Sequence, residues 1–181
     1  PIEPYTLGAW LGDGSSADGR ITGADLGVFD AIRAEGYKVG GDIAPSKPVA
    51  ETRTVYGLGP LLRSLGLRGN KHIPVYYQRG SAGQRMELLR GLMDTDGHCN
   101  ERGTATFTNT NERLALDVYE LCAGLGMKPL LYEYGNAHGP IWQVAFQAYQ
   151  DANPFKLTRK AARAKLGARP FTDLDDVLAQ P

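Results

Sequence analysis

The sequence predicts an α+β fold built from two pseudo-symmetric halves, each with an αββαββα-like order of elements. A short helical motif that ends in Asp-Gly occurs at residues 6–14 and again at residues 89–97, and similar strands and helices follow each copy in the same order. A repeat of this length indicates a duplicated small domain rather than a solenoid unit. We therefore divide the chain into residues 1–85, residues 86–170 and a tail at residues 171–181.

The elements of each half follow from the apolar spacing and the turn residues. The first half is expected to hold a strand at 20–23, a helix at 24–35, strands at 37–43 and 51–57, and a helix at 58–67. The second half is expected to hold a loop at 97–103, a strand at 104–108, a helix at 111–124 capped by Asn111, and hairpin strands at 127–134 and 141–147. In the last strand, Trp142, Val144 and Phe146 should face the core.

The two motifs, TLGAWLGDG and LRGLMDTDG, each have the pattern of an apolar helix with small residues four positions apart. These small residues are Gly8 and Gly12 in the first copy, and Gly91 and Thr95 in the second. Residues with this spacing share one helix face, so two such helices can pack with their backbones close together. This packing would bring Asp13 and Asp96, 83 positions apart in the chain, together at one end of the helix pair.

Two carboxylates at the C-terminal ends of helices face the negative pole of each helix dipole, which is unfavourable for an anion. A divalent cation would offset that cost. Oxygen ligands alone suit Mg²⁺, with Mn²⁺ as a substitute. We therefore expect Asp13 and Asp96 to bind metal, with the backbone carbonyls of Gly12 and Thr95 as further ligands. The alternative is that each aspartate only ends its helix in a turn.

Composition excludes some classes of protein and leaves nucleic-acid binding open. The formal net charge is zero, yet residues 42–85 hold seven Lys and Arg against two acidic residues, and residues 151–170 hold six against one. Phosphates respond to such local fields rather than to the total charge. The chain has no apolar stretch of membrane-spanning length and no signal peptide. Cys99 and Cys122 lack the spacing of a zinc site.

The paired motifs, with the run NKHIP at residues 70–74 between them, resemble the LAGLIDADG homing endonucleases in their single-chain, two-motif form. They are most similar to the endonuclease domains carried inside inteins, such as those of bacterial replicative helicases. The resemblance spans about residues 5–170. It implies that the motif helices pack at the centre and that antiparallel sheets form a DNA-binding saddle, with one half over each half-site.

The same resemblance implies a monomer whose partner is double-stranded DNA, with no obligate protein partner and no membrane association. Its location would be the bacterial cytoplasm, or wherever the host DNA lies. The implied activity is that of a site-specific endonuclease, which makes a metal-dependent double-strand break at a long, imperfectly symmetric target and leaves short 3′ overhangs.

Two lysines complete the expected catalytic set of Asp13 and Asp96. Lys71 belongs to the family's KxIP pattern and should lie beside the metals, where an ammonium can stabilise the transition state or polarise a water. Lys156 is its expected counterpart in the second half, although the run FKLTRK departs from KxIP and Arg159 or Lys160 could take this role. Asp94 lies two residues before Asp96 and should point elsewhere.

The exposed sides of the sheets supply the candidate DNA contacts, because Arg, Gln and Thr suit guanine, adenine and the thymine methyl group, and strand ribbons can enter a major groove. The same residue types are also ordinary on the solvent face of a strand. The candidates are Arg20, Thr22, Lys38, Lys47 and Arg53 in the first half, and Thr104, Thr106, Thr108, Gln143 and Gln147 in the second.

Two other interpretations compete with an active nuclease. One is a nuclease-inactive LAGLIDADG protein that binds nucleic acid as a maturase or regulator. Such a protein would be free to lose either aspartate, and both are present here. The other is a splicing intein. Because the sequence has no Cys or Ser at its start and no His-Asn pair at its end, we expect an endonuclease domain that does not splice by itself.

Overall fold

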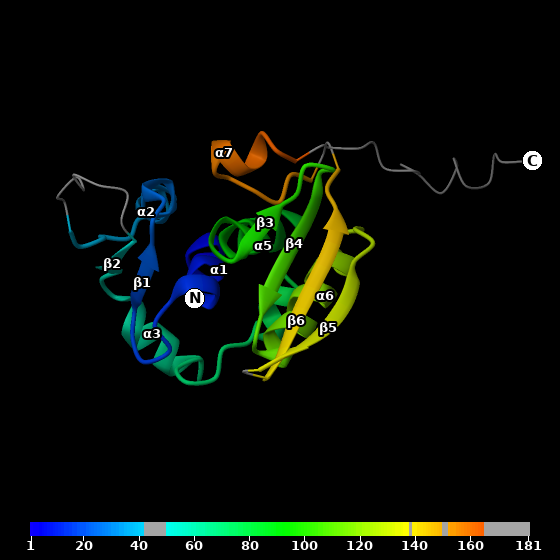
Figure 1. The fold of residues 1–181 in the computed structure, drawn as a ribbon. Helices are drawn as coiled ribbons and strands as arrows, with labels where there is room; N and C mark the ends of the chain where they lie inside the picture. Colours follow the sequence, from blue (N-terminus) through cyan, green and yellow to red (C-terminus); the bar gives the residue numbers. More distant parts are fainter. Residues whose placement is uncertain (42–49, 138, 150–151, 165–181) are drawn as a thin grey trace, which may run out of the picture.

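The computed structural model of the chain describes residues 1–41, 50–137, 139–149 and 152–164. The fold is α+β with antiparallel sheets, as predicted. Two helices lie side by side at its centre, with one sheet on either side of them (Figure 1). The predicted tail at residues 171–181 and Lys47 lie outside the described residues. None of the described helices is long and apolar enough to cross a membrane.

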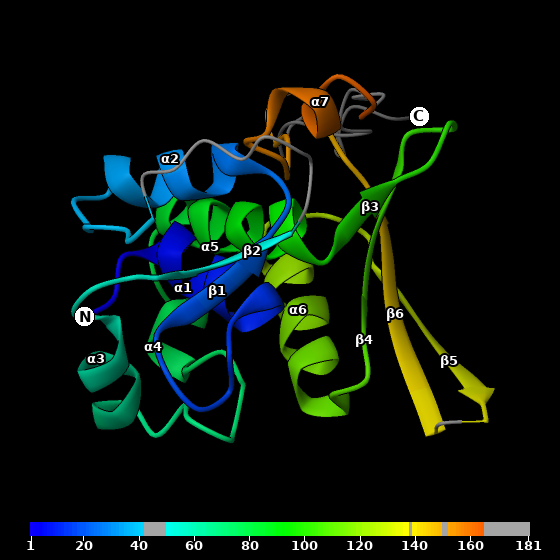
Figure 2. The ribbon, with the colours of Figure 1, turned by 60° about the vertical axis from the view of Figure 1, so that its left-hand side comes forward.

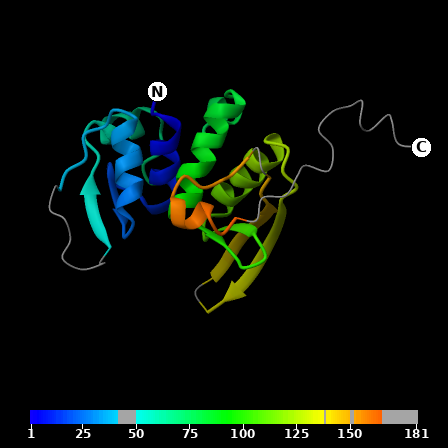
Figure 3. The same ribbon diagram turned by 90° about the horizontal axis from the view of Figure 1, so that it is seen from above.

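The central helices are α1 (Pro4–Asp13) and α5 (Ala82–Thr95), and they correspond to the two sequence motifs. Figure 3 shows them next to each other with the sheets flaring away below. Their backbones approach closely at the small residues. A Cβ atom at Gly8 would lie 2.9 Å from the amide nitrogen of Leu92, and one at Gly91 would lie 2.6 Å from that of Ala9. The close packing predicted from the small residues is therefore confirmed.

The first half places two paired strands next to these helices. Strand β1 (Arg20–Gly23) pairs antiparallel with β2 (Glu51–Thr54), and helix α2 (Leu26–Ala34) connects toward the second strand. Two further pairings consist of single bridges, Gly14 with Ile21 and Val39 with Val55. Thus the described part of the predicted strand at 37–43 contributes one bridge. Helices α3 (Leu58–Ser64) and α4 (Val75–Gln78) follow.

The second half follows the predicted αββαββα order in full. Its elements are α5, β3 (Gly97–Cys99), β4 (Thr104–Asn109), α6 (Glu112–Gly124), β5 (Leu130–Asn136), β6 (Gly139–Gln147) and α7 (Thr158–Ala161). The strands form an antiparallel sheet in the order β3-β4-β6-β5. The segment predicted as a loop at 97–103 therefore begins with a strand, because Gly97 pairs with Phe107.

Helix α6 covers one face of this sheet (Figure 2). The Asn111 side chain caps it by accepting from the amide of Leu114, as predicted. Alternation along the strands buries Phe107, Val144 and Phe146 against the helices and leaves the opposite face open to solvent. The sheet therefore has one apolar face and one polar face, as the sequence indicated.

Candidate active site

The central helices end side by side and bring two carboxyl groups together. Asp13 is the last residue of α1, Asp96 is the C-cap of α5, and their side chains are hydrogen-bonded to each other. Burial and the adjacent Asp96 carboxylate raise the pKa of Asp13 to about 6, and burial also raises the pKa of Asp96. The predicted meeting of Asp13 and Asp96 is thus present in the structure.

The donor set of this site fits a hard divalent cation. Two partly buried carboxylates at the negative ends of two helices form a concentration of negative charge, which a cation would relieve. Across the described ranges, no three His, Cys, Asp or Glu side chains converge. A metal here would therefore be held by the carboxylates, backbone carbonyls and water, which is the environment that Mg²⁺ prefers.

Lys71 lies directly beneath the end of α1. Its Nζ atom donates to three backbone carbonyls, those of Leu11 at 3.0 Å, Gly12 at 3.0 Å and Gly14 at 2.7 Å. Burial lowers the pKa of Lys71, while the carboxylates of Asp96 and Asp13 act in the opposite direction. The structure therefore brings the KxIP lysine to the carboxylate pair.

Lys160, rather than Lys156, occupies the equivalent position at the end of α5. Its Nζ atom donates to the carbonyls of Met93 at 2.9 Å, Asp94 at 2.8 Å, Thr95 at 3.3 Å and Gly97 at 2.7 Å. Burial lowers the pKa of Lys160 as it does that of Lys71. The two helix ends thus carry one buried lysine each.

The Lys156 ammonium lies elsewhere, so its predicted placement is wrong. It forms an ion pair with Glu87 at 2.6 Å and lies 4.8 Å from the centre of the Tyr5 ring. The reason is local: the Lys156 amide is held by Asp94, and the short helix α7 that follows carries Lys160 to the helix end. Asp94 itself points away from the carboxylate pair, as expected, toward Tyr5 and the backbone at 156–157.

The two backbone carbonyls expected as metal ligands each accept from one of these lysines. The carbonyl of Gly12 accepts from Lys71, and that of Thr95 accepts from Lys160. A carbonyl oxygen has two lone pairs, so each retains the capacity for a second partner. The Thr95 hydroxyl donates within α5, to Gly91 and Leu92.

Asn109 is a member of the site that sequence reasoning missed. Its amide nitrogen donates to the Asp96 carboxylate at 3.0 Å. The available signal was its position, because strand alternation places Asn109 on the same face as the buried residues Ala105 and Phe107, where a polar side chain is unusual. The position equivalent to Asn109 in the first half, two residues before the cap of α2, is Gly23.

A small cavity of about 180 Å³ opens beside Asp13. Its lining includes Gly23, Asp25, Thr95 and Arg159. The Arg159 guanidinium is held there by Asp25, with Nε at 2.6 Å from the carboxylate oxygen. Because Asp25 also caps α2, this ion pair joins the first half to the segment that carries Lys160.

The second sheet presents most of its expected DNA contacts on one open face. Thr104 pairs with Gln147 and Thr108 pairs with Gln143, and Thr106 lies between them on the same strand and face. The Gln143 amide donates to the Thr108 hydroxyl at 3.3 Å. Sequence reasoning omitted two exposed tyrosines of β5 beside this strip, Tyr132 and Tyr134.

In the first half, three of the expected contacts are accessible. Arg20 is exposed and paired with Asp18, at 2.8 Å. Thr22 is exposed and lies 2.8 Å from the hydroxyl of Thr52 on the neighbouring strand. Lys38 is exposed and stacks over the ring of Tyr56.

Arg53 contradicts its predicted place on the open face. Its side chain is only 6% exposed, is ion-paired with Glu51 at 2.8 Å, and lies over the Phe29 ring at 5.0 Å. It is the register partner of the buried Ile21, so it faces the helices, while Thr52 and Thr54 face solvent. A shift of one residue exchanges the two faces of a strand.

Comparison with known protein families and sequences identifies relatives of this chain. Residues 83–147 match the family model of the LAGLIDADG-like domain. The chain is 47% identical over 127 residues to the replicative DNA helicase DnaB of Mycobacterium intracellulare. That match covers 70% of this chain and 19% of the relative, so the chain spans about a fifth of the relative's length.

Solved structures share the fold. Mesophilic variants of the homing endonuclease I-DmoI match with a TM-score of 0.55 and 16% identity, over 81% of this chain and 88% of theirs. I-DmoI in complex with DNA and Ca matches with a TM-score of 0.55 and 17% identity, over 81% of this chain and 82% of that one. I-DmoI in complex with DNA and Mn has the same TM-score and 16% identity, over 91% and 98% of the two chains.

Proposed function

We propose that this LAGLIDADG protein is a site-specific DNA endonuclease that makes metal-dependent double-strand breaks. It contains a LAGLIDADG-like domain at residues 83–147 and has the fold of I-DmoI. One observation carries the proposal: Asp13 and Asp96 meet at the adjacent ends of the central helices, and each helix end holds its own buried lysine. A protein that only bound DNA would not require this costly arrangement of buried charges.

The open faces of the two sheets are the proposed DNA-binding surface. Thr, Gln and Tyr side chains line β4, β6 and β5, and Arg20 and Thr22 lie on β1. These groups can contact base edges and the phosphate backbone. Because the halves differ in sequence, the target would be long and imperfectly symmetric. Because both motif helices belong to one chain, a monomer suffices.

The proposed mechanism assigns a role to each residue of the centre. Asp13 and Asp96, with the carbonyls of Gly12 and Thr95, would hold Mg²⁺ or Mn²⁺. When bound, such an ion activates a water and neutralises charge on the leaving oxygen. Lys71 and Lys160 would stabilise the negative charge that develops on the phosphate in the transition state.

The products and the origin of the chain are also part of this proposal. Cleavage of the two strands at offset positions would leave short 3′ overhangs. The match to part of a replicative helicase supports an endonuclease domain carried by an intein within such a host protein.

A selection experiment tests the proposal. Duplexes bound by the protein in Ca²⁺ would be recovered from a random library and then incubated with Mg²⁺, alongside the Asp96→Asn variant. We expect the wild type to cut both strands of its selected duplexes and the variant to bind them without cutting. Sequence-specific binding with no cleavage in Mg²⁺ or Mn²⁺ would instead identify a nuclease-inactive binder, and no sequence preference would overturn both readings.

A further inference from the structure

We propose that Asp94 is a positioning residue: it docks the segment that carries Lys160 and so holds this lysine at the end of α5. We call residues 152–164 the C-terminal strap. The inference rests on the proposed function for the role of Lys160, but the docking itself is testable without DNA. Asp94 does not touch the reacting atoms; it acts through the strap.

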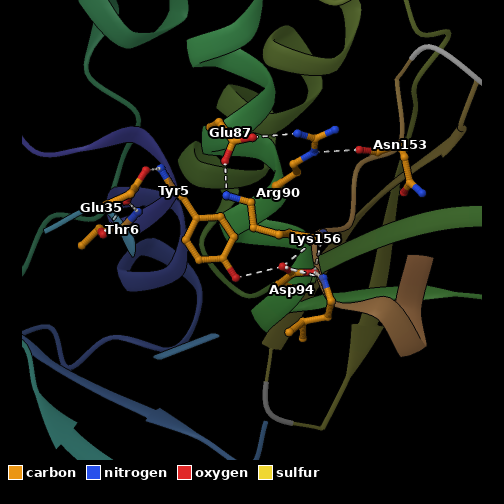
Figure 4. A network of polar contacts seen from close by, with 9 residues as sticks. Tyr5, Thr6, Glu35, Glu87, Arg90, Asp94, Asn153 and Lys156 are labelled. Carbon is orange, nitrogen blue, oxygen red and sulfur yellow. Dashed lines mark hydrogen bonds and ion pairs between the residues drawn. The ribbon is translucent and has the colours of Figure 1, made fainter. Parts of the chain in front are cut away.

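The Asp94 carboxylate is buried inside the protein, with 3% of its surface exposed. It accepts from the Tyr5 hydroxyl at 2.8 Å and from the backbone amides of Lys156 and Leu157 at 3.2 Å (Figure 4). A buried carboxylate is costly unless hydrogen-bond donors satisfy it. Two of these donors come from the strap, so the carboxylate and the strap stabilise each other.

The path from Asp94 to Lys160 is short and stiff. The Leu157 amide is bound to Asp94, and Leu157 is the N-cap of α7. The Leu157 carbonyl accepts from the amides of Lys160 at 3.0 Å and Ala161 at 2.8 Å, which forms the first turn of α7. That turn directs the Lys160 ammonium back to four carbonyls around the end of α5. A shift of the Leu157 amide would therefore move the lysine.

Contacts to three helices hold the rest of the strap. Lys156 pairs with Glu87 on α5, and Arg90 on the same helix donates to the Asn153 carbonyl at 3.0 Å. Arg159 pairs with Asp25 at the start of α2. Phe155 and Leu157 are buried as well. Among these contacts, Asp94 is the buried polar one, so its loss should have the largest effect on the strap.

Lys71 has separate supports, which makes the inference selective. The amide of Ile73, two residues after Lys71, donates to the Asp117 carboxylate at 2.7 Å. The Asn111 side chain donates to the Lys71 carbonyl at 2.8 Å. Both supports belong to α6 and its cap, far along the chain from Asp94. Loosening the strap should therefore affect Lys160 and leave Lys71 in place.

The first test requires no cleavage. Wild type and Asp94→Asn would be treated with an amine-acetylating reagent, and modification of each lysine would be followed by mass spectrometry. We expect acetylation of Lys160 to rise by about threefold or more in the variant, because local opening exposes it, while Lys71 serves as the unchanged internal reference. Unchanged labelling of Lys160, or an equal rise at both lysines, would overturn the proposal.

The second test uses coupling between substitutions. At saturating enzyme on a selected duplex, Asp94→Asn should lower the cleavage rate by about 10-fold or more, because a displaced group loses its alignment, with little change in binding in Ca²⁺. Added to Lys160→Met, the same substitution should cost less than about twofold, but added to Lys71→Met it should retain its full effect. Equal costs in both backgrounds would contradict the inference.

Two further variants guard against a general loss of folding. Tyr5→Phe removes one donor to Asp94 and keeps both strap amides, so it should raise Lys160 labelling less than Asp94→Asn does. Glu87→Gln removes only the partly exposed ion pair to Lys156 and should leave Lys160 labelling close to wild type. If Asp94→Asn fails to fold, Tyr5→Phe decides: raised labelling at Lys160 alone supports docking, and no change refutes it. If the wild type cuts no duplex, the labelling result still stands while the proposed function fails.

Discussion

The side-chain amide of Asn109 donates to the Asp96 carboxylate at 3.0 Å, whereas the corresponding position of the first half, Gly23, has no side chain to offer Asp13. The two carboxylates of the centre are therefore supported unequally. Hydrogen bonds from neighbouring side chains orient metal ligands and tune their affinity. This asymmetry leads to the first prediction.

Asn109→Gly should weaken binding of Mn²⁺ to the DNA-free protein by about 10-fold, because Asp96 loses the group that orients it. Electron paramagnetic resonance of free Mn²⁺ measures this directly. The reciprocal variant Gly23→Asn is a matched control. A side chain has room there, since the nearest atoms to a Cβ belong to the Phe29 ring at 3.8 Å. Unchanged Mn²⁺ affinity in Asn109→Gly would show that this hydrogen bond does not support a metal ligand.

The carboxylates themselves should be required for chemistry rather than for binding. We expect Asp13→Asn and Asp96→Asn each to abolish double-strand cleavage and to leave DNA affinity in Ca²⁺ close to wild type. Removal of Mg²⁺ with a chelator should have the same effect on the wild type. Gel analysis of cleavage and titration of a labelled duplex measure the two properties. Full cleavage by either variant would rule out a metal held between the aspartates.

The raised pKa of Asp13 predicts a pH-dependent stability in the metal-free protein. The folded state holds this proton with a pKa of about 6, against an ordinary value of 3.8. The favourable contribution of the protonated group is therefore complete below the ordinary value and is lost as the pH rises through 6. Asp13→Asn, which stays neutral, should exceed the wild type in free energy of unfolding by about 1–2 kcal/mol near pH 7.5, allowing for partial exposure, and match it near pH 4.

Urea unfolding with a chelator present measures this difference. Adding Mg²⁺ at neutral pH should reduce it, because the wild type gains a ligand that the folded state alone binds. A difference that is the same at both pH values would mean that the Asp13 carboxylate carries no electrostatic strain.

Arg53 now predicts a loss of stability rather than a loss of DNA affinity. Its guanidinium is buried between Glu51 and the Phe29 ring. Arg53→Ala should lower the free energy of unfolding by about 1–3 kcal/mol, since it removes a buried charged partner. The neighbour Thr52 lies on the open face, so Thr52→Ala should leave stability nearly unchanged and weaken binding to the selected duplex. An Arg53→Ala variant with normal stability and weak binding would restore its role as a DNA contact.

The elements that sequence reasoning placed correctly are those with strong local signals. Both motif helices combine small residues at helical spacing with a terminal Asp-Gly, and both appear at the centre with their aspartates together. Asn111 precedes a regular apolar stripe, and it caps α6 as expected. These features depend on contacts within a few residues, or on steric rules for a repeated pattern, so one sequence suffices to predict them.

The misplaced residues depend on information that local patterns do not contain. The run ETRTV alternates without a clear apolar face, so the register that buries Arg53 came from pairing with β1. The segment FKLTRK holds three basic residues within five positions, and the docking of its backbone on Asp94 determines which one reaches the helix end. Asn109 acts through Asp96, a contact between a strand end and a helix end that only the tertiary fold creates.

The last prediction separates the three lysines by position. Lys71 and Lys160 each bind the carbonyls around one end of the central helix pair, whereas Lys156 pairs with Glu87 away from the centre. At saturating enzyme, Lys71→Met and Lys160→Met should each lower the cleavage rate by about 10²-fold or more, as expected for groups that stabilise transition-state charge. Lys156→Met should change it far less, because only a partly exposed ion pair is lost. Single-turnover rates on a selected duplex, with binding measured in Ca²⁺, decide the assignment: a large loss in rate for Lys156→Met with a normal Lys160→Met would return the catalytic role to Lys156, and weaker binding with a normal rate for Lys71→Met would make that lysine a phosphate clamp.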